Sequence, residues 1–190
     1  MPLWTPQLIH LGAALLLLTS FAMLSQRRIL SLVNLFAWQG LILSASTAIV
    51  AFTSGQPHLY ISPALSLVLK VILFPWILHL LIRRLNVHFD TEPLLNIPTT
   101  MLVGLLLVIF AFALSQPLAA LSAGSASNTL GIALAVVMLS FLMMITRRKA
   151  VSQVVGFLAM ENGLFFAAVS ATHGMPMVVE LGVGLDVLVG

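Results

Sequence analysis

Four polar residues lie in the middle of long apolar stretches of this sequence. Glu161, Asp186 and Lys70 are ionisable, and Gln39 carries an amide. At the rise of an α-helix, each lies roughly 15–18 Å into its stretch, near the middle of a hydrocarbon core about 30 Å thick. A charge at that depth costs about 2.5–3.5 kcal/mol even on the lenient insertion scale, so such residues face protein or water and are a functional hypothesis by default.

Ionisable groups at one membrane depth predict a lateral proton path. Burial in a low dielectric destabilises the charged form of an acid or an amine, so buried groups can exchange protons near neutral pH. The predicted path contains Glu161, Asp186 and Lys70, and Glu180 and His79 are further candidates. The structural alternative is that Lys70 and one carboxylate form a buried ion pair that only fixes helix packing.

The two further candidates have ordinary readings as well. Glu180 lies about four residues inside its helix, where an interfacial acid is unremarkable. His79 follows Lys70 by nine residues, two and a half helical turns, so the two side chains do not share one face strictly. The five histidines show no metal-ligand spacing, the chain has no cysteine, and no phosphate-binding or nucleophile motif occurs. We therefore predict no catalytic, metal or cofactor-binding residue in this chain.

Composition predicts an all-α integral membrane protein. Of 190 residues, 61% are hydrophobic and 7% are charged, against about 25% charged residues in soluble domains. The net charge of +3 does not indicate nucleic-acid binding, because the basic residues form short clusters at helix ends rather than a patch. The predicted partners are lipid and other membrane proteins.

Apolar segments of about 20 residues predict seven transmembrane helices. They cover residues 4–25, 29–52, 58–82, 98–121, 128–146, 150–173 and 176 onward. Seven of the eight Lys and Arg residues fall in the first, third and fifth connections, so we expect those connections to be cytoplasmic and the N-terminus non-cytoplasmic. Trp4 and Tyr60 suit the outer interface, whereas Trp76 lies too deep for an interfacial anchor.

Spans one to three and five to seven resemble each other, which predicts two parallel repeats. Each set has a basic cluster, a helix with a polar residue partway along it, a Gly-x-Pro turn and a helix in which a charge precedes apolar residues. The matched features are Gln39 with Glu161, Gly55-Gln56-Pro57 with Gly174-Met175-Pro176, and Lys70 with Asp186. We divide the chain into an N-terminal repeat (1–84), a cytoplasmic loop with a linking helix (85–122) and a C-terminal repeat (123–190).

Three segments resemble a known family. They are Leu69–Pro75 (LKVILFP), Gly156–Gly163 (GFLAMENG) and Val179–Asp186 (VELGVGLD). Together they resemble hydrogenase-4 component E, a membrane subunit of energy-converting nickel–iron hydrogenases and formate hydrogenlyase-type complexes. The C-terminal half of component E is in turn similar to the K subunit of respiratory complex I.

The resemblance implies roles for individual residues. Glu161 and Asp186 match the two intramembrane carboxylates of the complex I subunit, which are held to form part of its proton path. The second is Glu in complex I and the shorter Asp in this sequence. Lys70 has no counterpart in the three-helix subunit, and Gln39 occupies the place of a second Glu161 with an amide that cannot titrate.

The sequence thus predicts a non-catalytic membrane-arm subunit of a complex I-related, redox-driven ion-translocating complex. By the resemblance, it lies in the inner (cytoplasmic) membrane beside antiporter-like subunits, and it is not an enzyme by itself. Two alternatives stay open, namely a purely structural scaffold subunit and a small free-standing transporter. The transporter is disfavoured because few polar side chains converge on a substrate site and Pro75 is the one expected helix discontinuity.

Overall fold

The computed structural model describes residues 5–54, 68–85, 95–121 and 127–172. The described elements are all helical. They are α1 (Thr5–Ser25), α2 (Ile29–Ser54), the π-helical segment η2 (Val68–Leu73), α4 (Phe74–Leu85), α5 (Ile97–Leu121), α6 (Ser127–Thr146) and α7 (Ala150–Thr172). The predicted all-α class is confirmed.

Five of these helices, α1, α2, α5, α6 and α7, are long and apolar enough to cross a membrane. Their bounds agree with the predicted spans within two residues at each end, because basic turns and Pro98 limit the apolar runs. The third span is described only from Val68 onward, as η2 and α4, and the seventh lies outside the described residues. The chain is a multi-pass membrane protein, and the seven-helix repeat arrangement stays a prediction.

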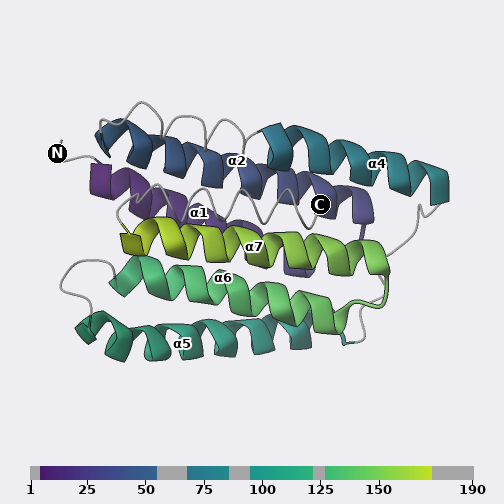
Figure 1. The fold of residues 1–190 in the computed structure, drawn as a ribbon. Coiled ribbons are helices and arrows are strands. Elements are labelled where there is room, and N and C mark those ends of the chain that lie inside the picture. Colours follow the sequence, from purple (N-terminus) through teal and green to yellow (C-terminus); the bar gives the residue numbers. More distant parts are fainter. Residues whose placement is uncertain (1–4, 55–67, 86–94, 122–126, 173–190) are drawn as a thin grey trace.

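Two helical hairpins form the centre of the molecule (Figure 1). The helices α1 and α2 are joined through residues 26–28, and α6 and α7 through residues 147–149, so each pair is antiparallel. The hairpins meet where α1 packs on α6 and where α2 packs on α7. The helix α5 packs on the outer side of α6, while η2 and α4 pack on α2.

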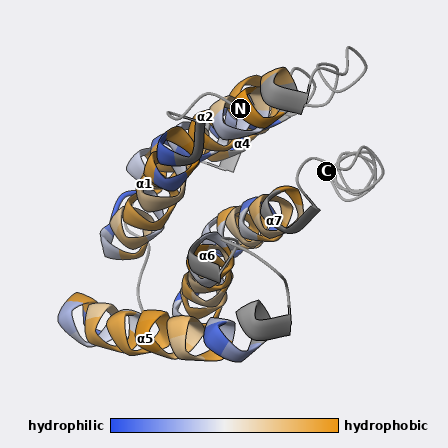
Figure 2. Cartoon of the chain, turned by 90° about the vertical axis from the view of Figure 1, so that its left-hand side faces the viewer, coloured by the Kyte–Doolittle hydropathy of each residue, from blue (hydrophilic) through white to orange (hydrophobic). Residues whose placement is uncertain are grey.

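Apolar side chains fill the space between these helices in two clusters. The larger cluster includes Phe36, Leu139 and Val155, all at most 1% exposed. Glycines let some helices approach closely, as at Gly163, where an added Cβ would meet Val136 and Val137 of α6 at 3.0 Å. Many exposed side chains are also large and apolar, as along α5, which Figure 2 shows as mostly hydrophobic with a hydrophilic turn toward one end. This pattern is expected for helices solvated by lipid.

The helix that carries Lys70 changes its hydrogen-bonding pattern at Pro75. Proline has no N–H to bond the carbonyl of the residue four positions earlier, and its ring clashes with that carbonyl. The segment Val68–Leu73 accordingly forms a π-helix, and regular α-helix begins at Phe74. The predicted discontinuity at Pro75 is confirmed, and Lys70 lies inside the π-helical segment.

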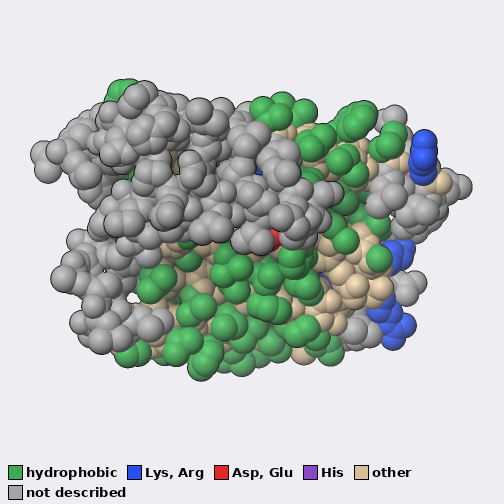
Figure 3. All heavy atoms as spheres, viewed as in Figure 1, with side chains coloured by type: hydrophobic (Ala, Val, Ile, Leu, Met, Phe, Trp, Pro, Cys, Tyr) green, Lys and Arg blue, Asp and Glu red, His purple; other side chains and the backbone are tan. Residues whose placement is uncertain are grey.

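Basic side chains collect at one end of the bundle (Figure 3). This end contains the α1–α2 turn with Arg27 and Arg28, the last turn of α4 with Arg84, and the α6–α7 turn. The basic turns therefore lie on a common side of the bundle, as the alternation of basic and non-basic connections in the sequence predicts. We call this side the basic end; its assignment to the cytoplasm rests on the positive-inside rule and stays a prediction.

Candidate functional site

Lys70 is the most deeply buried charged side chain of the membrane-spanning region among the described residues. It is 2% exposed, and its Nζ donates a hydrogen bond of 2.8 Å to Oδ1 of Asn162 on α7. The same Nζ lies 5.3 Å from the centroid of the Phe165 ring, within the range of a cation–π interaction. Two groups of α7, the Asn162 amide and the Phe165 ring, therefore stabilise the ammonium.

A line of hydrogen bonds continues from Asn162 across the bundle. Nδ2 of Asn162 donates to Oε1 of Gln39 at 3.3 Å, and Nε2 of Gln39 donates to Oγ of Ser20 at 2.9 Å. Ser20 Oγ donates to the carbonyl oxygen of Leu16 at 2.8 Å. The line links η2, α7, α2 and α1, and the side chains of its four polar members are all buried.

Every donor in this line points away from Lys70. In each hydrogen bond the donor belongs to the residue nearer to Lys70, and the accepting oxygen belongs to the residue farther from it. Two of the three links beyond Lys70 are amides, which do not titrate, and the last acceptor is a backbone carbonyl. The line is thus suited to orienting the acceptor of Lys70 and poorly suited to passing a proton toward α1.

The line runs sideways near the middle of the membrane-spanning region. Gln39 lies ten residues after Ile29, the first residue of α2, and Asn162 lies twelve residues after Ala150, the first residue of α7. At the α-helical rise these positions are about 15 and 18 Å from the basic end. The midplane depth predicted for Gln39 is consistent with this geometry.

Close approach of α2 and η2 brings Lys70 into this position. A Cβ added at Gly40 would lie 3.1 Å from the Cβ of Lys70 and 3.4 Å from its carbonyl oxygen, so a larger residue would push η2 away. One helical turn further, Ser44 is buried, and its hydroxyl has no hydrogen-bond partner within the described part of the chain.

The predicted acids are only partly described. Glu161 precedes Asn162 on α7, and its side chain is half-buried. Asp186 and Glu180 lie outside the described residues, so their part in the path stays a prediction. The structure thus brings Lys70, Gln39 and the α7 segment that contains Glu161 to one place.

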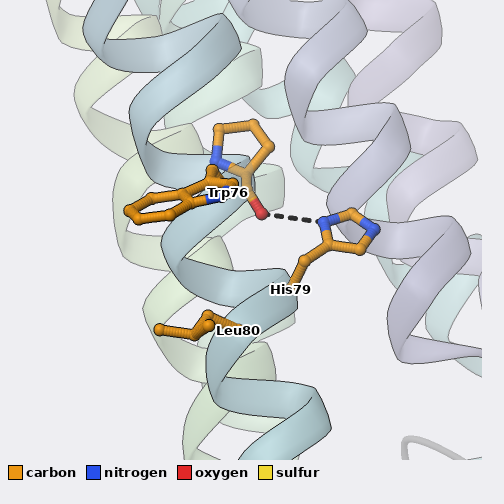
Figure 4. Close-up of a pocket in the computed structure, with 4 residues that line it drawn as sticks. Trp76, His79 and Leu80 are labelled. Carbon is orange, nitrogen blue, oxygen red and sulfur yellow. Dashed lines mark hydrogen bonds between the residues drawn. The ribbon is translucent and has the colours of Figure 1, made fainter.

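His79 lies further along the same helix, near the basic end. Its Nδ1 is 2.7 Å from the carbonyl oxygen of Pro75 (Figure 4). Because a carbonyl only accepts, this hydrogen bond assigns the proton to Nδ1 and leaves Nε2 as the acceptor of the neutral ring. The ring lines a groove of about 290 Å³ with Pro75, Trp76 and Leu80, and no described contact joins it to Lys70.

A second buried cation, Arg147, lies at the basic end. It is 2% exposed, and its Nη2 donates a 2.8 Å hydrogen bond to the carbonyl oxygen of Leu24 near the end of α1. Gln153 Nε2 donates to the Arg147 carbonyl at 2.9 Å. Desolvation by burial lowers the pKa of the Arg147 guanidinium below its ordinary value. The arrangement ties the α6–α7 turn to α1.

Two members of the line, Asn162 and Ser20, were not predicted from the sequence. Asn162 directly follows Glu161 in an apolar helix, so its polarity was an available signal. Ser20 resembles any serine that bonds its own helix backbone, and nothing in the sequence distinguishes it. Within the described residues, no three His, Asp or Glu side chains gather into a metal site, and the absence of a cofactor stays a prediction.

Comparison with known proteins extends over nearly the whole chain. "Uncharacterized protein Rv0085" from Mycobacterium tuberculosis is 34% identical over 182 residues, which are 95% of this chain and 83% of that protein. "Hydrogenase-4 component E" from Escherichia coli K12 is 25% identical over 176 residues, 93% of this chain and 82% of the relative. The chain belongs to the family that contains Rv0085 and hydrogenase-4 component E.

The match confirms the resemblance to component E that the three sequence segments indicated. The hydrogenase-4 component E of Shigella flexneri shows the same 25% identity over the same length. No family model and no solved structure matches the chain. The similarity between the C-terminal half of component E and the complex I K subunit therefore stays an expectation.

Proposed function

We propose that this component E relative is a non-catalytic membrane subunit of a redox-driven, ion-translocating complex of the energy-converting hydrogenase type. In this proposal Lys70 and Glu161 carry protons laterally through the subunit, and Asp186 continues the path. Glu180 and His79 serve at its margins. Antiporter-like subunits accept or supply the protons, and redox cofactors belong to other subunits. Two of the three relatives described above are named hydrogenase-4 component E, and this supports the assignment to a complex.

The observation that carries the proposal is the setting of Lys70. This lysine lies in a π-helical segment, is 2% exposed, and bonds to the residue that follows Glu161. Its ammonium group donates a 2.8 Å hydrogen bond to the neutral side-chain amide of Asn162. A buried amine and an acid at adjoining positions are the minimum needed for proton exchange between side chains.

The neutral members of the line act as positioning residues. Asn162 presents its oxygen to Lys70 because Gln39 accepts from its amide nitrogen, and Ser20 fixes Gln39 in turn. This arrangement also closes the α1 side, because the last acceptor, the Leu16 carbonyl, has no proton to pass on. Protons then enter and leave on the side of α7 and η2.

The experiment that tests the proposal replaces Glu161 by Gln in the assembled complex, in sealed vesicles. Proton translocation per electron transferred is measured after assembly has been confirmed. We expect translocation to collapse, because Gln has a similar shape but cannot titrate. The control is Ser152→Ala on the same helix, whose hydroxyl is buried without a hydrogen-bond partner among the described residues, and it should match the wild type.

Wild-type turnover together with wild-type translocation in Glu161→Gln contradicts the proton-path role. A variant that fails to assemble is replaced by Glu161→Asp, which keeps a titratable group. We expect the Glu161→Asp variant to assemble and to translocate protons more slowly, because its shorter side chain places the carboxyl group farther from the other groups of the path.

A scaffold role is the second candidate, and one observation favours it. Lys70 bonds a neutral amide within a fully buried line, which would also lock α7, α2 and α1 together without any proton transfer. The two candidates differ in the response to Glu161→Gln. A scaffold loses assembly or loses nothing, whereas a proton path loses translocation while the complex stays intact.

A further inference from the structure

The outward face of α2, η2 and α4 differs from an ordinary lipid-facing surface. It holds two adjacent grooves, one of about 310 Å³ lined by Asn34, Ala37, Trp38, Leu41 and Val71, and one of about 290 Å³ lined by Pro75, Trp76, His79 and Leu80. Val71 in the first groove and Pro75 in the second are four residues apart on one helix. We call the surface that carries both grooves the α2–α4 face.

Two tryptophans on this face lie deep in the membrane-spanning region. Trp38 is nine residues after the start of α2, and Trp76 is nine residues before the end of α4, so each lies about 14 Å from the basic end. They are 61% and 62% exposed within this chain. Tryptophans that anchor a protein in lipid lie at the membrane–water interface instead, so a different neighbour is needed to explain this pair.

Hydrogen-bonding groups accompany the tryptophans. Asn34 is exposed and makes no hydrogen bond within the described part of the chain. His79 Nδ1 donates to the Pro75 carbonyl, which leaves Nε2 available to a neighbour, and the residue is one of those that line the second groove. Figure 4 shows its ring on the other side of the helix from the Trp76 indole. Hydrocarbon offers neither donors nor acceptors, so polar side chains inside membranes generally face protein or water.

The outer face of α5 provides an internal comparison. Its central exposed residues are aliphatic or phenylalanine, namely Leu102, Leu105, Leu106, Ile109 and Phe110. No Trp, His or Asn interrupts this stretch, and lipid tails satisfy such a surface fully. The same chain thus shows a lipid-type face on α5 and a face of mixed polarity with exposed aromatics on α2–α4, the composition typical of protein interfaces.

We infer that the α2–α4 face binds a transmembrane helix of another subunit of the complex. That helix would fill the two grooves with aliphatic side chains and offer hydrogen-bonding groups to the Asn34 amide and to Nε2 of His79. The inference rests on the part of the proposed function that places the chain in a multisubunit membrane complex. It does not depend on proton transfer through Lys70.

The test uses site-specific photo-crosslinking in the assembled complex in its native membrane. The photoreactive residue p-benzoylphenylalanine replaces Trp38 or Trp76 in separate variants, and it replaces Phe110 on α5 as the control. We expect both tryptophan positions to crosslink to one subunit other than this chain, within a peptide of a membrane-spanning segment identified by mass spectrometry. The Phe110 position should give lipid adducts only.

Three outcomes overturn the inference. They are lipid adducts alone at both tryptophan positions, a crosslink to a second copy of this chain, and a crosslink to another segment of the same chain. Because crosslinking does not measure proton movement, its failure leaves the Glu161→Gln test unaffected, and the reverse is also true.

A second measurement tests Asn34 and His79 by ordinary substitutions, while the photoreactive residue stays at the position of Trp38. Asn34→Leu and His79→Leu are each combined with the probe at Trp38. Loss of one hydrogen bond in the interface should lower the crosslink yield by about fivefold, while Leu106→Ala on α5 should leave it unchanged. An unchanged or higher yield in both leucine variants contradicts the proposed recognition, because a lipid-facing leucine is favourable.

Discussion

Two buried cations in this protein are held in different ways. Lys70 and Arg147 are each 2% exposed, but Lys70 lies deep within the membrane-spanning region and Arg147 lies in the turn after α6 at the basic end. Side chains hold Lys70, through Asn162 and the Phe165 ring. The backbone carbonyl of Leu24 accepts from Arg147.

The difference suits Arg147 to a structural role and Lys70 to the proton-transfer role that we propose for it. A backbone carbonyl keeps its position as long as its helix does, so the Arg147 contact serves as a fixed clamp between α1 and the α6–α7 turn. The described partners of Lys70, Asn162 and Phe165, are side chains with rotatable bonds. The π-helical segment that contains Lys70 departs from regular helix geometry. Substitutions at the two sites should therefore change different measured quantities.

The largest effect on function is expected for Lys70→Met. Methionine approximates the length of lysine and suits the apolar surroundings, but it cannot carry a proton. Proton translocation per electron should fall at least about tenfold, as for loss of a proton-transfer group, while the complex still assembles. Arg84→Met, at an exposed position of the basic end, is the matched control and should translocate normally. Normal translocation in Lys70→Met would show that Lys70 does not transfer protons.

The largest effect on stability is expected for Arg147→Leu. The substitution leaves the Leu24 carbonyl without its buried donor, which should lower the free energy of unfolding by about 1–3 kcal/mol. Thermal unfolding of the purified protein in detergent measures this loss. The neighbouring Arg148→Leu removes an exposed charge and should change stability by less than about 0.5 kcal/mol. Equal losses of stability in the two variants would show that the hydrogen bond from Arg147 to the Leu24 carbonyl contributes no particular stability.

The helices and the depth of Lys70 could be predicted from the sequence. Apolar length and basic turns define the membrane spans, as the agreement between residues 29–52 and Ile29–Ser54 shows. Pro75 predicted a discontinuity because its ring and missing N–H act within one helix. Local chemistry was sufficient for these features.

The hydrogen-bond line could not be predicted, because it depends on how four elements pack. Successive residues of a helix differ by about 100° in direction, so the sequence did not show whether Glu161 or Asn162 meets Lys70. The π-helical segment changes that direction again for Lys70 itself. Ser20 enters the line only because α1 packs on α2 at the level of Gln39.

A smaller effect is expected at Asn162, where the chemistry of the acceptor can be varied. Asn162→Leu removes the oxygen that faces Lys70 and should lower translocation about fivefold, the factor for one net hydrogen bond. Asn162→Gln keeps both the oxygen that accepts from Lys70 and the N–H group that donates to Gln39, on a side chain one methylene longer, and should retain more of the translocation. Equal losses in both variants would indicate that the amide serves packing rather than the orientation of Lys70.

The smallest effect is expected for Gly40→Ala, which tests whether the position of the Lys70 backbone matters. The added Cβ would lie 3.1 Å from the Cβ of Lys70, so η2 has to shift by a few tenths of an ångström, at a cost of about 1 kcal/mol. Gly163→Ala is the matched control, because its Cβ would meet Val136 and Val137 at a similar 3.0 Å. Both variants should lose similar stability in thermal unfolding, but only Gly40→Ala should slow translocation, by about twofold, since a slightly displaced Lys70 weakens its hydrogen bond. Equal translocation in the two variants would show that the site tolerates movement of η2 and that the side chains alone position Lys70.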